Sequence, residues 1–519
     1  MKRWLFGLLA GCCLGSALAA SATIGIQLGP SSLDPHFAIS TPNQMVSLHL
    51  FDALLLRDED MRLIPGLATE WERIDSLTWE FRLRRGVRFH DGTPFTAADV
   101  AFSVERAPLV PNSPASFAGA VAEIEDTEIV DDHTIRFHTR QPFPMFVNDI
   151  ARIFIVSHQI AAQATTQDFN SGLATIGTGP YRLIDYAPGE LIRLQRNPDY
   201  WGPPPDVEDL NLRIISNDAA RVAALLSGSV DMIDVVPPAD RERLADDPRV
   251  RLAEITSSRV IYLGLDHYHA SSPHIRDRRG RALAENPLKD RRVREALSLL
   301  IDRQALVERV LHGAGEPAGQ LVPYPLFGHN PEIQPPPHDP ERARALLAEA
   351  GFANGFQLTV HGPNNRYIND AQVLMTVAQM LARGGLDVNV QLMPANVFFQ
   401  RAGRQEFSLF LLGYSSSSGD AFRGLRAILA SWNPRAGMGA SNRGRYSNPA
   451  LDQVIRDLLA ADEEEEREHL IYEASRLGFG EHAVIPLFFQ TNMWATRPGF
   501  YYVPRRDERT LGINLRLDR

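Results

Sequence analysis

A strand–helix–strand pattern in the C-terminal half constrains the fold of this chain more than any other feature of its sequence. Residues 357–361 are apolar at alternate positions and lead into the loop 362–367 (Gly-Pro-Asn-Asn-Arg-Tyr), as a strand does where it ends in a turn. From Asn369 the apolar residues recur at helical spacing up to the Gly384-Gly385 pair, and residues 386–392 alternate again. Crossovers of this kind join parallel strands, so the pattern predicts a parallel α/β sheet.

A second polar loop follows the next strand. The apolar run 407–412 predicts a buried strand, and residues 413–420 (Gly-Tyr-Ser-Ser-Ser-Ser-Gly-Asp) come directly after it. Ligands of open α/β sheets bind beyond the carboxyl ends of the strands. Both polar loops therefore lie where a ligand site is expected.

Length and composition exclude several classes of protein. A chain of 519 residues is long enough for two to four compact units, and 44% apolar with 22% charged residues is ordinary globular composition. The formal charge of −10 without a basic stripe argues against a nucleic-acid partner. Lys2 and Lys289 are the only lysines, which excludes a phosphate-binding loop with its Gly-Lys pair.

The first twenty residues, 1–20, predict an export signal. A basic start is followed by an apolar stretch and by Ala-Leu-Ala at 17–19, a small-x-small cleavage site. Residues 9–12 (Leu-Ala-Gly-Cys) also resemble a lipobox, which would leave Cys12 lipidated, but that cut leaves a very short apolar core. Both cysteines lie in this segment, so the exported domain needs no disulfide. No later segment is long and apolar enough for a membrane helix.

A half-exposed antiparallel sheet is expected earlier in the chain. Residues 79–84 and 134–138 alternate strictly between apolar and polar side chains. Between them an Asp-Gly turn is followed by Thr96 and Asp99, which can cap a helix running to Glu105.

At this segment the sequence resembles a known family. The order Arg-Gly-Val-x-Phe (85–89), Asp-Gly-Thr-Pro (91–94) and Ala-x-Asp-Val (97–100) is similar to the signature of extracellular solute-binding proteins of bacterial ABC importers, in the dipeptide, oligopeptide and nickel-binding group (solute-binding protein family 5). Further strings follow in the family's order at residues 33–36, 178–181, 197–202, 226–231, 293–297 with 301–303, and 485–487. The resemblance thus extends over nearly the whole chain.

The resemblance implies an α/β fold: a two-lobed, periplasmic-binding-protein-like clamshell with an additional small α+β domain. Two crossing segments would join the lobes, with hinge strands near 260–263 and 484–487. The expected parts are lobe one (21–41, 166–258 and 487–519), the additional domain (42–165) and lobe two (259–486).

Arg366 is the first candidate ligand-binding residue. In dipeptide-binding members of the family, an arginine at the matching loop position pairs with the ligand's carboxylate. A guanidinium suits that task because its fork makes two parallel hydrogen bonds. Asn365 and Tyr367 would line the same loop. The alternative is that Arg366 binds Asp370 or faces solvent.

The partner for a peptide's α-amino group is where the sequence departs from the family. Many members carry an aspartate four residues after the glycine that matches Gly413, and this chain has Ser417 there. Asp420 could reach inward instead, or it could be an exposed turn acid. Two other kinds of ligand therefore remain possible: one that has a carboxylate but no cationic group, and a polyhydroxylated one that hydrogen-bonds to the serines from Ser415 to Ser418. The serines could equally form a loop without ligand contact.

Aromatic and small polar residues complete the candidate site. Tyr414 and Phe399 offer flat surfaces for apolar parts of a ligand, although aromatic residues at strand ends belong more often to the core. The loop with Ser40 and Thr41 matches the region through which lobe one contacts ligands in relatives. Trp494 would approach the cleft near the second crossing segment, although packing is the simpler interpretation.

Three histidines, His267, His269 and His274, lie close to Asp266 in the sequence, and the resembling family includes nickel binders. Their spacing fits no compact imidazole set on one helix, so a solvated cluster is the preferred interpretation. We predict no metal and no cofactor.

We expect an exported, periplasmic and non-enzymatic receptor that captures a small peptide or peptide-like solute and presents it to a membrane-embedded ABC permease. The expected state is a monomer with no nucleic-acid partner. One alternative is a binder of nickel, haem, opine or sugar-conjugate solutes. A second alternative, from another class of protein, is a secreted serine hydrolase. The sequence contains no Gly-x-Ser-x-Gly elbow motif to support it.

Overall fold

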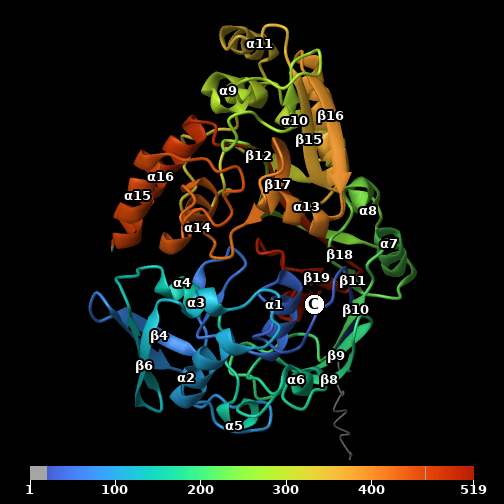
Figure 1. Cartoon of the computed structure of the whole chain (residues 1–519). Coiled ribbons are helices and arrows are strands. Elements are labelled where there is room, and N and C mark those ends of the chain that lie inside the picture. The colour runs from blue at the N-terminus through green and yellow to red at the C-terminus, as the bar shows by residue number, and fades with distance from the viewer. Residues whose placement is uncertain (1–19, 462, 519) are drawn as a thin grey trace, which may run out of the picture.

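The computed structural model describes residues 20–461 and 463–518 (Figure 1). Residues 1–19, which hold most of the predicted export signal and Cys12, lie outside the described residues. Two lobes stand one above the other in this view, and a small domain extends the lower one. None of the helices in the described part of the chain is long and apolar enough to cross a membrane.

One sheet of twelve strands runs through both lobes, in the order β13-β15-β17-β12-β18-β11-β1-β10-β9-β8, with β14 paired to β18 and β16 to β15. The first lobe is the part around β1 (Ser21–Ile26), β8 (Tyr181–Ala187), β9 (Leu191–Arg196), β10 (Asp209–Ile214) and β11 (Met232–Ile233). Its helices are α1 (Thr41–Leu50), α5 (His158–Ala161), α6 (Thr166–Asn170), α7 (Asp218–Ser227) and α8 (Arg241–Ala245).

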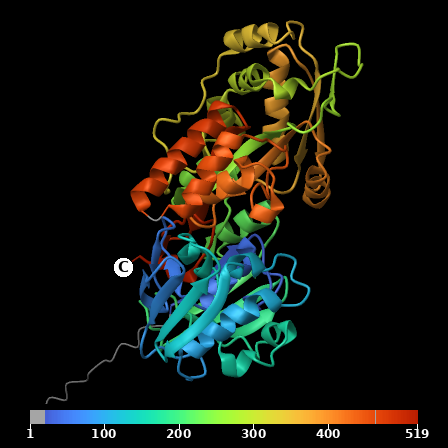
Figure 2. The ribbon, with the colours of Figure 1, turned by 60° about the vertical axis from the view of Figure 1, so that its left-hand side comes forward.

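The small domain has its own antiparallel sheet in the order β4-β5-β7-β6, as the alternating pattern predicted. Figure 2 shows its blue and cyan strands in the lower half of the molecule. A carboxylate of Asp99 accepts the backbone N–H of Thr96 at 2.8 Å, so the predicted cap is present. Its elements are β2 (Leu55–Arg57), β3 (Leu63–Pro65), β4 (Ala68–Arg73), β5 (Thr78–Leu83), β6 (Ile124–Asp131), β7 (Thr134–Thr139), α2 (Ala97–Arg106), α3 (Ala118–Val121) and α4 (Phe146–Ile150).

The second lobe contains the strand–helix–strand unit. Val360 pairs in parallel with Val390 of the next strand and with Leu409 of the one after, which confirms the predicted parallel arrangement. Its strands are β13 (Ile275–Arg276), β14 (Gly315–Pro317), β15 (Gln357–Pro363), β16 (Asp387–Met393) and β17 (Leu409–Ser415). Its helices are α9 (Arg291–Leu299), α10 (Arg303–Ala305), α11 (Pro340–Glu349), α12 (Asp370–Arg383), α13 (Ala395–Gly403), α14 (Phe422–Gly424), α15 (Pro449–Ala460) and α16 (Glu464–Gly480).

Strand β17 differs from its predicted range of 407–412. It begins at Leu409 and continues to Ser415, because Ser415 pairs with Arg259 of the neighbouring strand. Pairing across the sheet therefore extends the strand into a segment whose own residues, Gly413 and the following serine, predict a loop.

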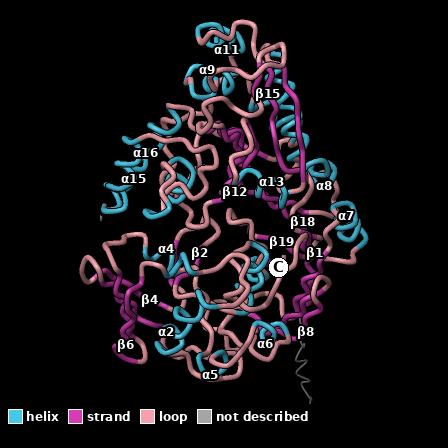
Figure 3. The backbone as a smooth tube through the Cα atoms, in the orientation of Figure 1, coloured by secondary structure: helices cyan, strands magenta, loops and turns pink. Residues whose placement is uncertain are grey.

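Two long antiparallel strands, β12 (Arg251–Leu265) and β18 (Val484–Thr496), pass between the lobes (Figure 3). The runs 260–263 and 484–487, predicted as hinge strands, lie on these two crossing strands and are paired with each other inside the second-lobe sheet, so their role as hinges stays a prediction. The pairing of the two strands is interrupted next to the first of these runs, at residues 257–259. The chain then returns to the first lobe through β19 (Phe500–Tyr502) and β20 (Leu515–Leu517).

Several of the sequence segments that match the family make buried hydrogen bonds that connect distant parts of the chain. Asp52, which is buried, accepts hydrogen bonds from Thr178 Oγ1 and Trp201 Nε1, both at 2.8 Å, and so joins the strings 178–181 and 197–202. In the second lobe, Arg303 Nε donates to the carbonyl oxygen of Pro486 at 2.8 Å. These motif residues are structural, since a buried polar group requires a partner.

The small domain and the second lobe share one apolar core. A single cluster of buried residues includes Phe81 and Phe137 of the small domain together with Leu425 and Phe489 from the other side. Gly419 lies so close to the small domain that a Cβ at this position would be 2.8 Å from Met61 Cβ. The exact residue boundaries of the three parts remain predictions.

Candidate functional site

The polar loops after β15 and β17 meet the break in β12 and the C-terminal segment. We call this region the junction and define it as residues 256–259, 364–370, 413–420 and 505–509. The N–H of Ser258 donates to the carbonyl oxygen of Arg506 at 3.0 Å, and Ser258 Oγ lies 2.8 Å from Ser415 Oγ. The junction therefore combines backbone from both lobes.

The loop that carries Arg366 is organised by Asp370. Its Oδ2 accepts the backbone N–H groups of Arg366 at 2.8 Å and of Tyr367 at 3.0 Å. Tyr367 is half-buried, and its hydroxyl donates to the carbonyl oxygen of Gly413 at 3.4 Å. Asp370 thus fixes the loop through its backbone and leaves the Arg366 side chain free.

Arg366 is exposed and its guanidinium makes no hydrogen bond to any described residue. The guanidinium carbon lies 5.3 Å from the centroid of the Tyr367 ring, close enough for a cation–π contact. The charge of Arg366 lowers the pKa of two acids at the junction, Asp370 and Glu508, as one of several contributions to each. Sequence reasoning left open whether this cation binds Asp370 or faces solvent, and the side chain faces solvent at the junction.

Glu508 and Arg259 form an ion pair that the sequence did not predict. Arg259 Nε and Nη2 donate to the two Glu508 oxygens at 2.7 and 2.6 Å, and Ser257 Oγ donates to Oε1 at 3.0 Å. Burial would raise the pKa of Glu508, but the Arg259 charge and these hydrogen bonds outweigh burial and hold it below its usual range. Glu508 also has a positive φ of 64°, an uncommon conformation for a residue with a side chain.

The serine loop is held by internal hydrogen bonds. Ser416 Oγ donates to the carbonyl oxygen of Asp420 at 2.7 Å and accepts its N–H at 3.1 Å. Ser415 contacts Ser258, while Ser417 is exposed. Within the described residues, none of these hydroxyl groups is hydrogen-bonded to a histidine, the contact that a serine nucleophile would need.

Asp420 is only 4% exposed and acts inside the protein. Its Oδ1 accepts the N–H of Arg423 at 3.3 Å, at the start of α14. Burial raises the pKa of Asp420, and the charge of Arg57 partly offsets that effect. This placement favours a structural role over the predicted contact with a ligand.

Asn365 and Phe399 are connected with helix α13. Asn365 is exposed, and its Oδ1 accepts the N–H of Ala395 at 2.9 Å, at the first residue of the helix. The Phe399 ring is half-buried and packs edge-on against Phe398, with ring centroids 5.3 Å apart. Asn365 therefore ties the Arg366 loop to the helix.

The first-lobe candidates lie apart from this group. Ser40 and Thr41 are half-buried at the start of α1, and Ser40 Oγ donates to Asn43 Oδ1 at 2.8 Å. Helix α1 reaches the junction through Gln44, whose Oε1 accepts a hydrogen bond from Arg509 Nη2 at 2.7 Å. Trp494 is buried and Nε1 donates to Thr510 at 2.8 Å, so the packing interpretation of this residue is confirmed.

An arginine group next to Tyr414 also escaped sequence reasoning. Arg423 of the second lobe pairs with Asp149 of the small domain, and Arg152 lies 3.6 Å from the same carboxylate. Tyr414 is half-buried beside them: burial first, and then the charge of Asp420, raises its pKa. Nothing in the local sequence around these arginines distinguishes them from the many surface arginines.

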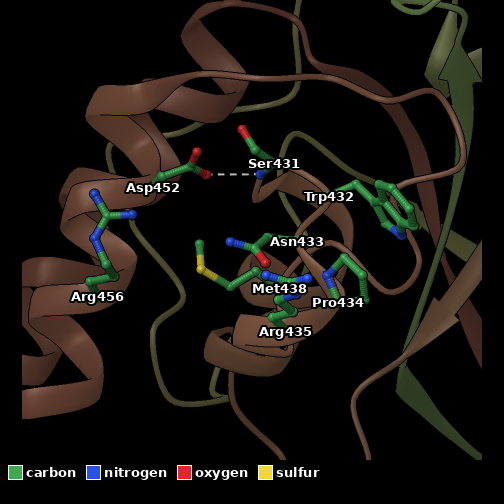
Figure 4. Close-up of a pocket in the computed structure, with 8 residues that line it drawn as sticks. All are labelled: Ser431, Trp432, Asn433, Pro434, Arg435, Met438, Asp452 and Arg456. Atoms are coloured by element: carbon green, nitrogen blue, oxygen red, sulfur yellow. Dashed lines mark hydrogen bonds between the residues drawn. The ribbon is translucent and has the colours of Figure 1, made fainter.

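Two cavities lie in the second lobe away from the predicted residues. The first, of about 360 Å³, is shown in Figure 4. Its dashed bond runs from the N–H of Ser431 to Asp452 at 2.8 Å, and its lining residues are Ser431, Trp432, Asn433, Pro434, Arg435, Met438, Asp452 and Arg456. The other, of about 400 Å³, is lined by residues from the α11 and α12 ends such as Phe352 and Gly384. We locate the candidate site at the junction, because its free cation and mixed origin from both lobes fit solute capture better.

The histidines considered for metal binding have separate partners. His267 Nε2 lies 3.0 Å from the carbonyl oxygen of Ala483, and His269 Nδ1 lies 3.1 Å from Asp266. His274 packs against His361 with ring centroids 4.4 Å apart. Across residues 20–461 and 463–518, no three His, Cys, Asp or Glu side chains are grouped so that they could hold a metal ion.

Two lobes that share a sheet and are linked by a pair of crossing strands have the architecture of proteins that close around a solute. The comparison with known families agrees with this class. The chain belongs to family 5 of the bacterial extracellular solute-binding proteins, because the family profile described as "Bacterial extracellular solute-binding proteins, family 5 Middle" matches residues 62–435, more than two thirds of its length.

Individual relatives match the chain from end to end. The glutathione-binding protein GsiB of Salmonella choleraesuis is 29% identical over 525 residues, which cover 97% of this chain and 96% of the relative. HbpA2 of Haemophilus parasuis superimposes with a TM-score of 0.81 at 23% identity, covering 96% of this chain and 100% of the other. The periplasmic binding protein DppA of Helicobacter pylori, solved with the peptide STSA, gives 0.77 at 22% identity, covering 96% and 99%. The last two likenesses establish the fold.

Proposed function

We propose that this protein is the substrate-binding component of an ABC importer, which captures a peptide or peptide-like solute between its lobes and delivers it to a membrane permease. Membership of family 5 and the end-to-end match to a glutathione-binding protein support this proposal. An exported, periplasmic and monomeric receptor without catalytic activity fits the same proposal.

The observation that carries the proposal is the free guanidinium of Arg366. It stands at the end of β15 on a loop that Asp370 holds rigid, and it faces solvent at the junction. A carboxylate of the solute can accept two parallel hydrogen bonds from it. When the lobes close, water leaves and the lower local dielectric strengthens the pair.

Closure follows from differential affinity. A solute shifts the open–closed equilibrium only by the difference between its affinities for the two states. The interruption of pairing at residues 257–259 provides a place where a few backbone dihedrals can change while both halves of the sheet stay intact. Arg259 and Glu508 flank this break and join β12 to the C-terminal segment.

The nature of the solute's other end is less constrained. Ser417 is exposed and supplies no charge for an α-amino group, and buried Asp420 is a weak substitute for the missing aspartate. An opine or a sugar conjugate with a carboxylate would meet the same free guanidinium. We therefore propose a carboxylate-bearing solute and keep short peptides as its leading class.

The test is calorimetric titration of the purified exported chain with short peptides and with their C-terminal amides. Arg366→Ala should weaken binding of the free-acid peptide by about 2 kcal/mol or more and change amide binding little, because one desolvated charge pair is lost. Arg435→Ala, in the cavity of Figure 4, is the matched control and should bind as the wild type does. Unchanged binding by Arg366→Ala, or turnover of an ester or peptide, would contradict the proposal.

A further inference from the structure

Arg152 is a largely buried cation whose hydrogen-bonding capacity is unused. Its side chain is 17% exposed, and its Nε is buried without a hydrogen-bond partner. Its one ion contact among the described residues is Nη1 to Asp149 Oδ1, at 3.6 Å, which is too long for a hydrogen bond. Buried arginines ordinarily have their donors paired, because an unpaired buried charge is costly.

The one carboxylate that Arg152 contacts among the described residues is already engaged. Asp149 pairs directly with Arg423, which comes from the second lobe, and both side chains are mostly buried. Two guanidinium groups therefore share one carboxylate at the contact between the small domain and the second lobe. One positive charge in this group is left without an acid of its own.

Neighbouring charges add to the imbalance around Arg152. Burial first, and then the positive charge of Arg509, lowers the pKa of Arg152. Arg509 does not take up a free acid there either, because it already donates to Asp507 at 2.9 Å and to Gln44 at 2.7 Å. An added carboxylate would be stabilised by this excess of positive charge.

Arg152 and Arg366 are connected through β17 and the loop that follows it. Gly413 faces the Tyr367 ring, 2.6 Å from the place of its missing Cβ, and so belongs to the side where Arg366 lies. Tyr414, the next residue, points to the opposite side of the strand. Arg152 is linked to the end of the same loop through Asp149, which pairs with Arg423, because the N–H of Arg423 donates to Asp420 Oδ1. The two cations are thus linked to opposite ends of the segment 413–420.

We propose that Arg152 binds a second acidic group of the solute, so that the protein selects peptide-like molecules with one carboxylate for Arg366 and another for Arg152. This inference rests on the proposed function, because it requires a solute held at the junction. Such a molecule would lie across the end of β17, with Tyr414 beside the second carboxylate. The competing explanation is that Arg152 only stabilises the contact around Asp149.

Matched peptides separate the two explanations. The probes are tripeptides ending in a free glycine carboxylate, with Glu or Gln at the first or second position, titrated by calorimetry at pH 7. The wild type should bind the better Glu peptide about tenfold or more tightly than its Gln counterpart, as expected for a hydrogen-bonded charge. In Arg152→Gln this ratio should fall to about one, while the Gln peptide keeps its affinity.

The ratio of affinities is the decisive readout, because a purely structural defect would weaken both peptides together. Asp149→Asn is the second variant: it keeps Arg152 and removes the competing carboxylate, so the ratio should stay the same or rise. Equal binding of Glu and Gln peptides by the wild type, an unchanged ratio in Arg152→Gln, or a ratio of one in Asp149→Asn would overturn the inference. Absence of binding by all four peptides would instead contradict short peptides as the leading solute class of the proposed function.

Discussion

Replacement of Asp52 by asparagine should make the stability of the protein less dependent on pH. Asp52 is buried at the meeting point of Thr178 and Trp201, both of which donate to the same carboxylate oxygen. Asparagine has nearly the same shape and keeps a carbonyl oxygen that can accept both hydrogen bonds. The substitution therefore removes a titrating group and little else.

The size of the effect follows from the pKa of Asp52. Burial raises this pKa from 3.8 to about 6, although hydrogen bonds from Trp201 and Thr178 oppose the shift. The folded protein thus holds the Asp52 proton more tightly than the unfolded chain does. The resulting stabilisation is fully present below about pH 4 and is lost as pH rises through 6. Two pKa units correspond to about 3 kcal/mol.

Urea unfolding followed by tryptophan fluorescence at pH 4, 5, 6 and 7 measures this difference. The free energy of unfolding of Asp52→Asn, minus that of the wild type, should increase by about 3 kcal/mol between pH 4 and pH 7. Asp185→Asn replaces an exposed carboxylate and serves as control. A difference that stays constant across this pH range would refute the reasoning, even if the variant were more or less stable overall.

Two further predictions concern the contact between the lobes. Gly419→Ala should destabilise the protein by about 1–3 kcal/mol more than Gly189→Ala in thermal unfolding, because both glycines have positive φ but only the first would bring a Cβ against Met61. Equal destabilisation would mean that Gly419 does not pack tightly against the small domain. Glu508→Gln should lower the free energy of unfolding by about 2–3 kcal/mol, since it leaves the guanidinium of Arg259 without its charge partner. A loss of less than about 0.5 kcal/mol would class the pair with ordinary surface ion pairs.

Much of the second lobe could be predicted from local patterns. The alternation at 357–361 and the helical spacing after Asn369 arise from which face of each element is buried, and that information is written in the order of the residues. The position of Arg366 at the end of its strand follows from the same patterns together with the rule for ligand sites in α/β sheets. The two-lobed architecture was expected only from the resemblance to the family, because no local sequence pattern indicates the number of lobes.

Other features required the packed structure. The apolar runs 260–263 and 484–487 are short and bounded by polar residues, and only the structure shows that they pair with each other and that the pairing breaks beside them at residues 257–259. Asp420 looked like a turn acid or a ligand contact and is buried, at a place where its neighbour Gly419 lies against Met61 of the small domain. Burial depends on neighbours that are distant in sequence, so local spacing cannot supply it.

By itself, the sequence determined the parallel unit of the second lobe and the polar loop that carries Arg366, since these depend on periodicity and on local turn residues, while the family resemblance implied the class of fold. The tertiary structure alone decided where the sheet pairing breaks, which acid Arg259 meets and that Arg152 shares Asp149 with Arg423. These are questions of charge and packing between segments hundreds of residues apart in the chain, such as Arg259 and Glu508. Such contacts exist only once both lobes are folded.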